Sequence, residues 1–258
     1  MSFRGLVRQG IIDKLPKDIR LFTERQYFRV YMREEIATLK ELCNKNKNVV
    51  DVGANKGDLA LFFIKFARHV YCFEPIPSIC ESLARRFREC NISIHCCALG
   101  AIEGEGKLII PCVRGEELRT RASMVKQFAE EIISGNRVEG TREVSVEVKK
   151  MDSLDLQNIG LIKIDVEGYE LEVLEGARET IIREMPNLYV ELEQMHNSSR
   201  RFWETVNTIV KMGYKGFFKA KGRTYRIEDS NLDELQSLEK RETEDYINNF
   251  IFIPCDKM

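Results

Sequence analysis

A short apolar run that ends in a glycine-containing turn is the sequence feature that most limits how this chain can fold. The run is VVDVGANKGDLA, from Val49 to Ala60, in which a segment of high β-propensity gives way to an acid, two glycines and an apolar helical pattern. A parallel strand that ends in such a turn brings backbone N–H groups and a helix N-terminus to the carboxyl edge of a sheet. The stretch therefore predicts an α/β sheet with a nucleotide-like ligand at that edge.

The rest of the chain repeats this alternation of strand and helix. Strands are predicted from NVVDVG, HVYCFEP, ISIHCCALG, LIKIDVEG and NLYVELE, and helices from DLALFFIKFAR, SICESLARRFREC, ELEVLEGARETIIREM and RRFWETVNTIVKMG. Such alternation is typical of right-handed βαβ units, in which helices cover a mainly parallel sheet. Further strands are predicted from KLIIP and VSVEVKKM, which flank a polar stretch, and from KGFFKAKG and NFIFIP near the end of the chain.

We expect a single domain over residues 1–258. Residues 1–46 are predicted to be a helical extension, and residues 113–143 an insertion of mixed charge. The insertion is by default a solvated segment, and its position also makes it a candidate lid that selects the acceptor and excludes water. Three aromatic residues of the extension are expected to pack in the core, with an acceptor pocket or a homodimer face as alternatives: Tyr27, Phe28 and Tyr31.

Composition excludes several classes of protein. The chain has 40 Lys and Arg against 41 Asp and Glu, so its net charge of -1 provides no field that would attract nucleic acid or anionic lipid. The eight cysteines include no C-x-x-C pair, and we interpret them as reduced thiols of a cytoplasmic protein. No segment has the apolar centre of a signal peptide or the length of a membrane span. We therefore expect neither a nucleic-acid partner nor a membrane span.

The glycine turn and an acid on the next predicted strand together indicate a cofactor that contains adenosine. Glu74 ends that strand, where its carboxylate can accept hydrogen bonds from both ribose hydroxyls. Dinucleotide oxidoreductases and S-adenosylmethionine methyltransferases both use this arrangement. Between Gly53 and Gly57 the middle glycine of the G-x-G-x-x-G dinucleotide fingerprint is absent, and Asp51 suits a cationic amino-acid ligand better than a pyrophosphate. We favour the methyl donor, with an NAD(P)-dependent oxidoreductase as the alternative.

Several motifs resemble those of the FkbM-type S-adenosylmethionine-dependent methyltransferases. They are VVDVGANKG, CFEP, ALG, LIKIDVEGYELEVLEGA and NLYVELE, and the resemblance runs from about Val49 to His196. It implies a class I, Rossmann-like methyltransferase fold with a mixed, mainly parallel sheet, helices on both faces and a last strand that runs antiparallel. It also implies S-adenosylmethionine as cofactor and O-methylation of a hydroxyl on a small molecule, sugar or glycan.

The resemblance assigns parts of the cofactor to positions of this sequence. The ribose falls to Glu74, with Pro75 beside it, and the adenine is flanked by residues around Ala98, including Cys97. An Asn often precedes the A-x-G step in the family, whereas this chain has cysteines there, so backbone groups would bind the adenine. The methionine part would be lined by Asp51, Gly53, Ala54, Asn55 and Gly57.

The segment LIKIDVEG supplies the candidate catalytic residues. Strand alternation puts Lys163 and Asp165 on one face. Asp165 lies at the carboxyl end of the strand beside the expected sulfonium, where we also expect it to contact the cofactor. An alcohol needs a base to accept its proton or a metal to lower its pKa. We expect Asp165 or His196 to be that base, Glu191 to orient it or bind substrate hydroxyls, and Lys163 to pair with a nearby acid. A purely structural ion pair and a plain surface histidine are the alternatives.

Two further residues are predicted substrate contacts. Ser123 lies in RASMV, which resembles a serine step of the family, and Glu167 follows the strand and is equally a candidate helix cap. A divalent metal on Asp165, Glu191 and His196 would have suitable hard ligands, although we expect none. A non-catalytic nucleoside-binding scaffold is disfavoured, because it has no physical need for acids at three strand ends.

Overall fold

The computed structural model divides the chain into two compact units, Met1–Leu42 and Cys43–Met258. In the first unit it describes the helix α3 (Arg33–Leu42), and Tyr27, Phe28 and Tyr31 lie outside the described residues. All other features reported below belong to the second unit. The described residues are 33–113, 116–117, 122–124, 140–193, 199–237, 239–240, 243 and 245–257.

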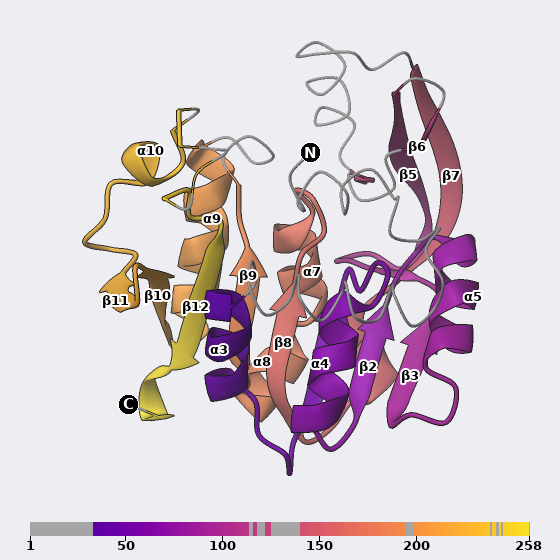
Figure 1. Cartoon of the computed structure of the whole chain (residues 1–258), viewed down its shortest axis with the longest axis horizontal. Coiled ribbons are helices and arrows are strands. Elements are labelled where there is room, and N and C mark those ends of the chain that lie inside the picture. The colour runs from indigo at the N-terminus through magenta and orange to yellow at the C-terminus, as the bar shows by residue number, and fades with distance from the viewer. Residues whose placement is uncertain are drawn as a thin grey trace. The chain divides into compact units, whose positions relative to one another are not determined.

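An eight-stranded sheet lies at the centre of the second unit (Figure 1). Its strands are β1 (Asn48–Val52), β2 (Val70–Phe73), β3 (Ile92–His95), β8 (Ile159–Ile164), β9 (Asn187–Glu191), β10 (Tyr214–Ala220), β11 (Arg223–Arg226) and β12 (Asn249–Pro254). They are arranged in the order β11-β10-β12-β9-β8-β1-β2-β3. The five strands from β9 to β3 are parallel, while β12 runs antiparallel to both β9 and β10. The predicted mixed, mainly parallel sheet with an antiparallel last strand is confirmed.

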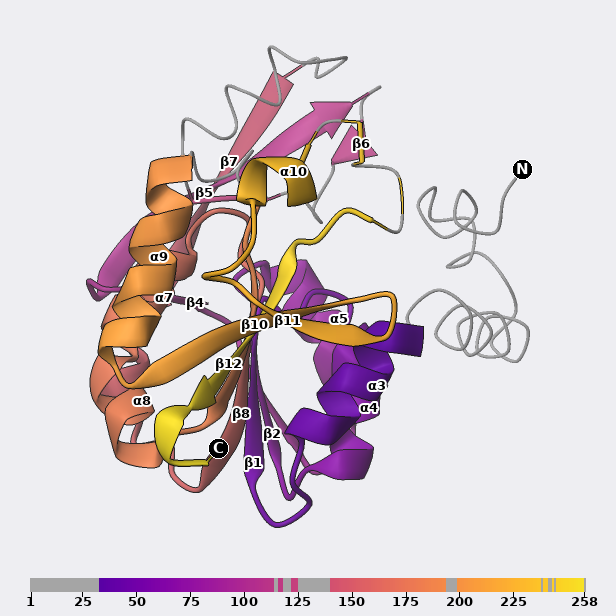
Figure 2. The same ribbon diagram turned by 90° about the vertical axis from the view of Figure 1, so that its left-hand side faces the viewer.

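Helices cover both faces of this sheet, as Figure 2 shows. The helices α4 (Asp58–Phe66) and α5 (Pro77–Arg86) lie on one face, and α7 (Glu170–Gly176), α8 (Arg178–Glu184) and α9 (Ser199–Lys211) on the other. Because both faces are covered, all five residues of β1 are buried, including the polar Asn48 and Asp51. The short helices η3 (Met151–Leu154), α10 (Leu232–Leu235) and η4 (Cys255–Lys257) complete the fold, and α10 and β11 have no counterpart in the sequence prediction. Within the described part of the chain, no helix has the length and apolar character to cross a membrane.

A second, four-stranded sheet contains the end of ISIHCCALG, a segment that the sequence predicted to be one strand. It comprises β4 (Ala98–Leu99), β5 (Gly104–Val113), β6 (Glu116–Glu117) and β7 (Gly140–Lys149) in the order β4-β7-β5-β6. The prediction of one strand from ISIHCCALG was wrong, because pairing with β2 ends at His95 and Ala98 then pairs with Val148 of β7. The predicted strands KLIIP and VSVEVKKM are confirmed and pair with each other.

The predicted helix ELEVLEGARETIIREM is divided in two at Ala177. The backbone there has φ -113° and ψ 6°, which ends α7. The carboxylate of Asp152 then accepts hydrogen bonds from the N–H groups of Glu179 and Thr180, at 3.1 and 2.8 Å. A carboxylate at this position satisfies N–H groups that have no partner within a helix, so α8 can begin immediately.

The insertion at residues 113–143 is described only in part. Its ends belong to β5 and β7, and residues 116–117 and 122–124 are the described positions between them. Ser123 pairs with Ile109 of β5 through two backbone hydrogen bonds, at 2.8 and 3.0 Å. This pairing fixes one short piece of the insertion against the second sheet.

Gly176 marks a close approach between α7 and the residues after β4. A Cβ atom built at Gly176 would lie 2.0 Å from the carbonyl oxygen of Gly100, so Gly176→Ala must push the helix away. We expect the free energy of unfolding to fall by about 1–3 kcal/mol. Gly140→Ala is the matched control, because a Cβ there meets no atom within 4 Å. Thermal denaturation of both variants checks this, and equal melting temperatures would contradict it.

Candidate functional site

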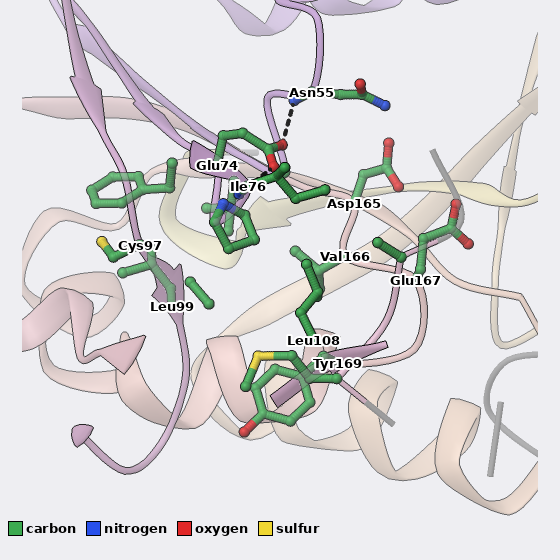
Figure 3. A pocket seen from close by; sticks show the side chains of 17 residues that line it. Asn55, Glu74, Ile76, Cys97, Leu99, Leu108, Asp165, Val166, Glu167 and Tyr169 are labelled. Carbon is green, nitrogen blue, oxygen red and sulfur yellow. Dashed lines mark hydrogen bonds between the residues drawn. The ribbon is translucent and has the colours of Figure 1, made fainter. Parts of the chain in front are cut away.

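A pocket lies where the carboxyl ends of β1, β2 and β8 meet the second sheet (Figure 3). Asn55 and Glu74 form one side of it, and Cys97 and Leu99 another. Leu108 of β5 and Tyr169 contribute apolar surface, as do Ala122 and Met124 from the insertion. The carboxylates of Asp165 and Glu167 lie on the remaining side. The pocket thus joins a polar edge made by the central strands to an apolar wall made largely by the second sheet.

The glycine turn after β1 has the backbone conformation that its sequence predicts. Gly53 has φ 77°, in the left-handed region that favours glycine. A Cβ atom at Gly53 would lie 1.9 Å from the carbonyl oxygen of Asp165, so no other residue fits without movement of the backbone. The N–H of Gly53 donates a hydrogen bond to the carbonyl oxygen of Phe73 at 2.9 Å. The turn therefore packs directly on both neighbouring strands and presents bare backbone to the pocket.

Glu74 is a buried carboxylate at the edge of this turn. It accepts hydrogen bonds from the N–H of Asn55, at 3.0 Å, and from the N–H of Ile76, at 2.9 Å. Burial raises the pKa of Glu74, and these two hydrogen bonds only partly oppose that effect. Each carboxylate oxygen has a second lone pair, so Glu74 can still accept hydrogen bonds from a ligand.

An ion cluster connects β1 with β8 beneath the turn. The Nζ atom of Lys163 lies 3.2 Å from Oδ1 of Asp51 and 3.4 Å from Oδ2 of Asp165, so the predicted pairing of Lys163 with a nearby acid is confirmed. Burial by itself would lower the pKa of Lys163, but the two carboxylates outweigh burial and raise it. Burial raises the pKa of Asp51, and Lys163 opposes this shift. Lys163 is therefore the protonated centre of the cluster.

The structure separates the predicted cofactor residues into two groups. Those that line the pocket are Gly53, Asn55, Glu74, Pro75, Cys97, Ala98 and Asp165. Among the described residues, Asp51, Ala54 and Gly57 are not part of the lining. Asp51 and Ala54 are buried, and Gly57 is a left-handed residue at the start of α4. All these assignments to the cofactor stay predictions.

Of the other predicted catalytic residues, the structure describes Glu191 but not His196. Glu191 ends β9 beside Asp165, since Val190 pairs with Ile164, and its Oε1 accepts a hydrogen bond from Nδ2 of Asn248 at 2.6 Å. His196 lies outside the described residues. No group of His, Cys, Asp and Glu suited to a metal ion occurs in the ranges that the structure describes.

Ser123 and Glu167 contact each other. The hydroxyl of Ser123 donates to the carbonyl oxygen of Glu167 at 2.6 Å, and Ser123 is almost fully buried. The side chain of Glu167 lines the pocket. At the start of α7 the N–H of Gly168 donates a hydrogen bond to the carboxylate of Glu170, at 2.9 Å. The insertion is thus linked to the residues that follow β8.

Part of the pocket was not predicted from the sequence. Tyr169 follows the E-G step of LIKIDVEGYE directly, so its position after the strand was a usable signal. The apolar wall formed by Leu108, Ala122 and Met124 depends on how the second sheet folds back, and no local pattern indicates that.

Comparison with known proteins agrees with this geometry. The model of the methyltransferase FkbM domain matches residues 51–226. The chain belongs to the FkbM methyltransferase family. A curated relative in this comparison, Methyltransferase 1 of Beauveria bassiana (strain ARSEF 2860), is 27% identical over an alignment of 158 residues, and the match covers 56% of this chain and 64% of the relative. The match therefore spans less than two thirds of that relative's length.

Two solved structures resemble this FkbM family member to different degrees. Methyltransferase FkbM from Methylobacillus flagellatus KT superposes with a TM-score of 0.51 at 18% identity, covering 81% of this chain and 44% of that one. SMU.1697c from Streptococcus mutans, a putative methyltransferase in complex with SAH, gives a TM-score of 0.43 at 8% identity, covering 86% and 95% of the two chains. The second similarity is too low to carry an argument. The predicted class I methyltransferase fold is confirmed.

The raised pKa of Glu74 predicts how stability depends on pH. Below pH 4.5, the ordinary pKa of a glutamate, this carboxyl is protonated in the folded and the unfolded state. Above pH 4.5 the carboxyl of Glu74 loses its proton first in the unfolded state. The free energy of unfolding of the wild type therefore falls with pH until Glu74 is ionised in the folded state as well. The stability of Glu74→Gln relative to the wild type should therefore rise with pH. Urea denaturation of both proteins between about pH 4 and pH 8 checks this, and a flat or falling difference would contradict it.

Proposed function

We propose that this chain is an S-adenosylmethionine-dependent O-methyltransferase that acts on a hydroxyl of a sugar, a glycan or another natural product. One observation carries the proposal: a single pocket brings together the bare turn at Gly53, the carboxylate of Glu74 and the carboxylate of Asp165. Membership of the FkbM family supports the same reaction class.

The residues around the pocket fit an adenosine cofactor with a methionine tail. Glu74 would accept hydrogen bonds from the ribose hydroxyls, because its oxygens lie at the pocket and keep free lone pairs. The backbone of the Gly53 turn would line the methionine part, since Gly53 lines the pocket and has no side chain of its own. The apolar surface near Cys97 and Leu99 would receive the flat base. When bound, the cofactor would supply an electrophilic methyl group on its sulfonium.

The acceptor would approach from the side of Asp165 and Glu167. The side chain of Asp165 is 34% exposed, so it can reach a ligand while its other oxygen contacts Lys163. There it would accept the proton of the acceptor hydroxyl, which makes the oxygen a competent nucleophile. His196 remains the alternative base, and Glu191 would orient the base or bind further hydroxyls. Glu167 would contact the acceptor at the pocket edge.

The insertion would contribute to acceptor selection. Ala122 and Met124 already line the pocket, and Ser123 binds the carbonyl of Glu167, so its influence on the substrate would act through that hydrogen bond. The lid predicted for the remainder of the insertion falls on residues outside the described ranges. We further propose a cytoplasmic enzyme, in keeping with eight free cysteines, and an acceptor other than nucleic acid, in keeping with a net charge of -1.

Calorimetric titration separates this function from that of an NAD(P)-dependent oxidoreductase. We expect the purified protein to bind S-adenosylhomocysteine and not NAD or NADP, because the turn lacks the middle glycine that admits a pyrophosphate. Incubation with labelled methyl donor and a panel of glycans and lipid-linked sugars then reads methyl transfer by mass. Binding of a dinucleotide in place of S-adenosylhomocysteine would overturn the proposal.

Asp165→Asn tests the proposed base. We expect methyl transfer to fall by about 100-fold or more, which is the usual contribution of a general base. The melting temperature should stay close to wild type, since the side chain is partly exposed and its shape is kept. Glu81→Gln, at a carboxylate that is 70% exposed on α5, is the control and should change neither quantity. Full activity of Asp165→Asn would assign the proton to another residue.

A further inference from the structure

Lys163 is a buried cation that contacts both halves of the proposed site. It pairs with Asp51 in the register of β1 and β8, and its side chain is 6% exposed. Its Nζ atom donates a hydrogen bond to the carbonyl oxygen of Gly53 at 3.0 Å and lies 3.4 Å from Oδ2 of Asp165. One ammonium group thus holds the glycine turn on one strand and the pocket carboxylate on the next.

The two carboxylates around Lys163 restrict where its ammonium group can lie. Buried charges are stable only when they are paired, and an ammonium has three N–H groups to share. Apart from the ion pair with Lys163, neither oxygen of Asp51 has a hydrogen-bond partner among the described residues. Lys163 therefore compensates Asp51 while it contacts Asp165, and a rotation away from either would leave a carboxylate without its cation.

We infer that Lys163 is a positioning residue that fixes the Gly53 turn and the Asp165 carboxylate relative to each other. The inference rests on the proposed function, because that function assigns the turn to the cofactor and the carboxylate to the acceptor. Lys163 itself is not part of the described pocket lining, and its partners keep it protonated, so it does not accept the acceptor's proton.

Such a role matters because methyl transfer depends on the alignment of the reacting atoms. A displacement of about 1 Å in a reacting group can cost about 100-fold in rate. Without the ammonium, Asp51 and Asp165 would face each other with no cation between them. The turn would also lose its hydrogen bond at the carbonyl of Gly53. Both the cofactor side and the acceptor side of the pocket would shift.

Calorimetric titration with S-adenosylhomocysteine tests the inference without knowledge of the acceptor. We expect Lys163→Met to bind at least about 10-fold more weakly than the wild type, and Lys163→Arg, which keeps the cation, to recover part of that loss. Ile162→Val is the matched control, because Ile162 lies on the same strand in the hydrophobic core. It removes buried surface but should leave the affinity unchanged. All titrations are made well below the melting temperature of each variant.

A second pair of variants covers the case in which Lys163→Met does not fold. That variant leaves Asp51 buried without its ion pair, which is a strongly destabilising arrangement. Asp51→Asn alone keeps Lys163 in contact with Gly53 and Asp165, whereas Asp51→Asn with Lys163→Met removes both charges. We expect the double variant to bind at least about 10-fold more weakly than Asp51→Asn. The inference would be overturned if Lys163→Met bound S-adenosylhomocysteine as tightly as the wild type, or if the double variant bound it as tightly as Asp51→Asn. A wild type that binds no S-adenosylhomocysteine would instead overturn the proposed function.

Discussion

The contact on which the site depends is the ammonium of Lys163 between the carboxylates of Asp51 and Asp165. Lys163 and Asp51 are buried charges that require partners, so these two residues constrain where β1 and β8 can lie, while Asp165 is partly exposed at the pocket. Asp51 and Lys163 pair in the register of β1 and β8, and a slip of one residue would turn one of them to the opposite face. The register in turn places Asp165 against the Gly53 turn. Fold and site are therefore specified by the same few side chains.

Much of this architecture could be predicted because it is encoded locally. Strand and helix alternate with clear apolar patterns, and parallel strands bring their carboxyl ends to one edge whatever their order. Gly53 and Glu74 could be placed at the pocket for that reason, as could Asp165. The α/β class followed from the alternation of strands and helices, and alternation along LIKIDVEG placed Lys163 and Asp165 on one face. The class I methyltransferase fold with its antiparallel last strand was implied by the resemblance to the FkbM family.

Other features depend on contacts between distant segments and left no local signal. ISIHCCALG contains no Pro, Asn or Asp that would interrupt a strand, so nothing in it marks His95 as the point where the chain leaves the main sheet. The division of the helix at Ala177 depends on Asp152, a residue of η3. Ser123 was expected to contact the substrate, yet its hydroxyl donates to the carbonyl of Glu167, a partner that only the folded second sheet brings near. The apolar wall at Leu108 has the same origin.

The two sheets divide the work of the proposed enzyme. The central sheet presents bare backbone and fixed carboxylates, which would bind a cofactor common to many methyltransferases. The second sheet and the described residues of the insertion form the apolar wall, and loops and insertions of this kind usually set substrate choice on a shared fold. The most direct test is a crystal structure of the protein with S-adenosylhomocysteine. We predict that the ribose hydroxyls bind Glu74 and that the sulfur faces Asp165. A pocket filled by the protein's own side chains, with the nucleoside absent or bound elsewhere, would contradict the account.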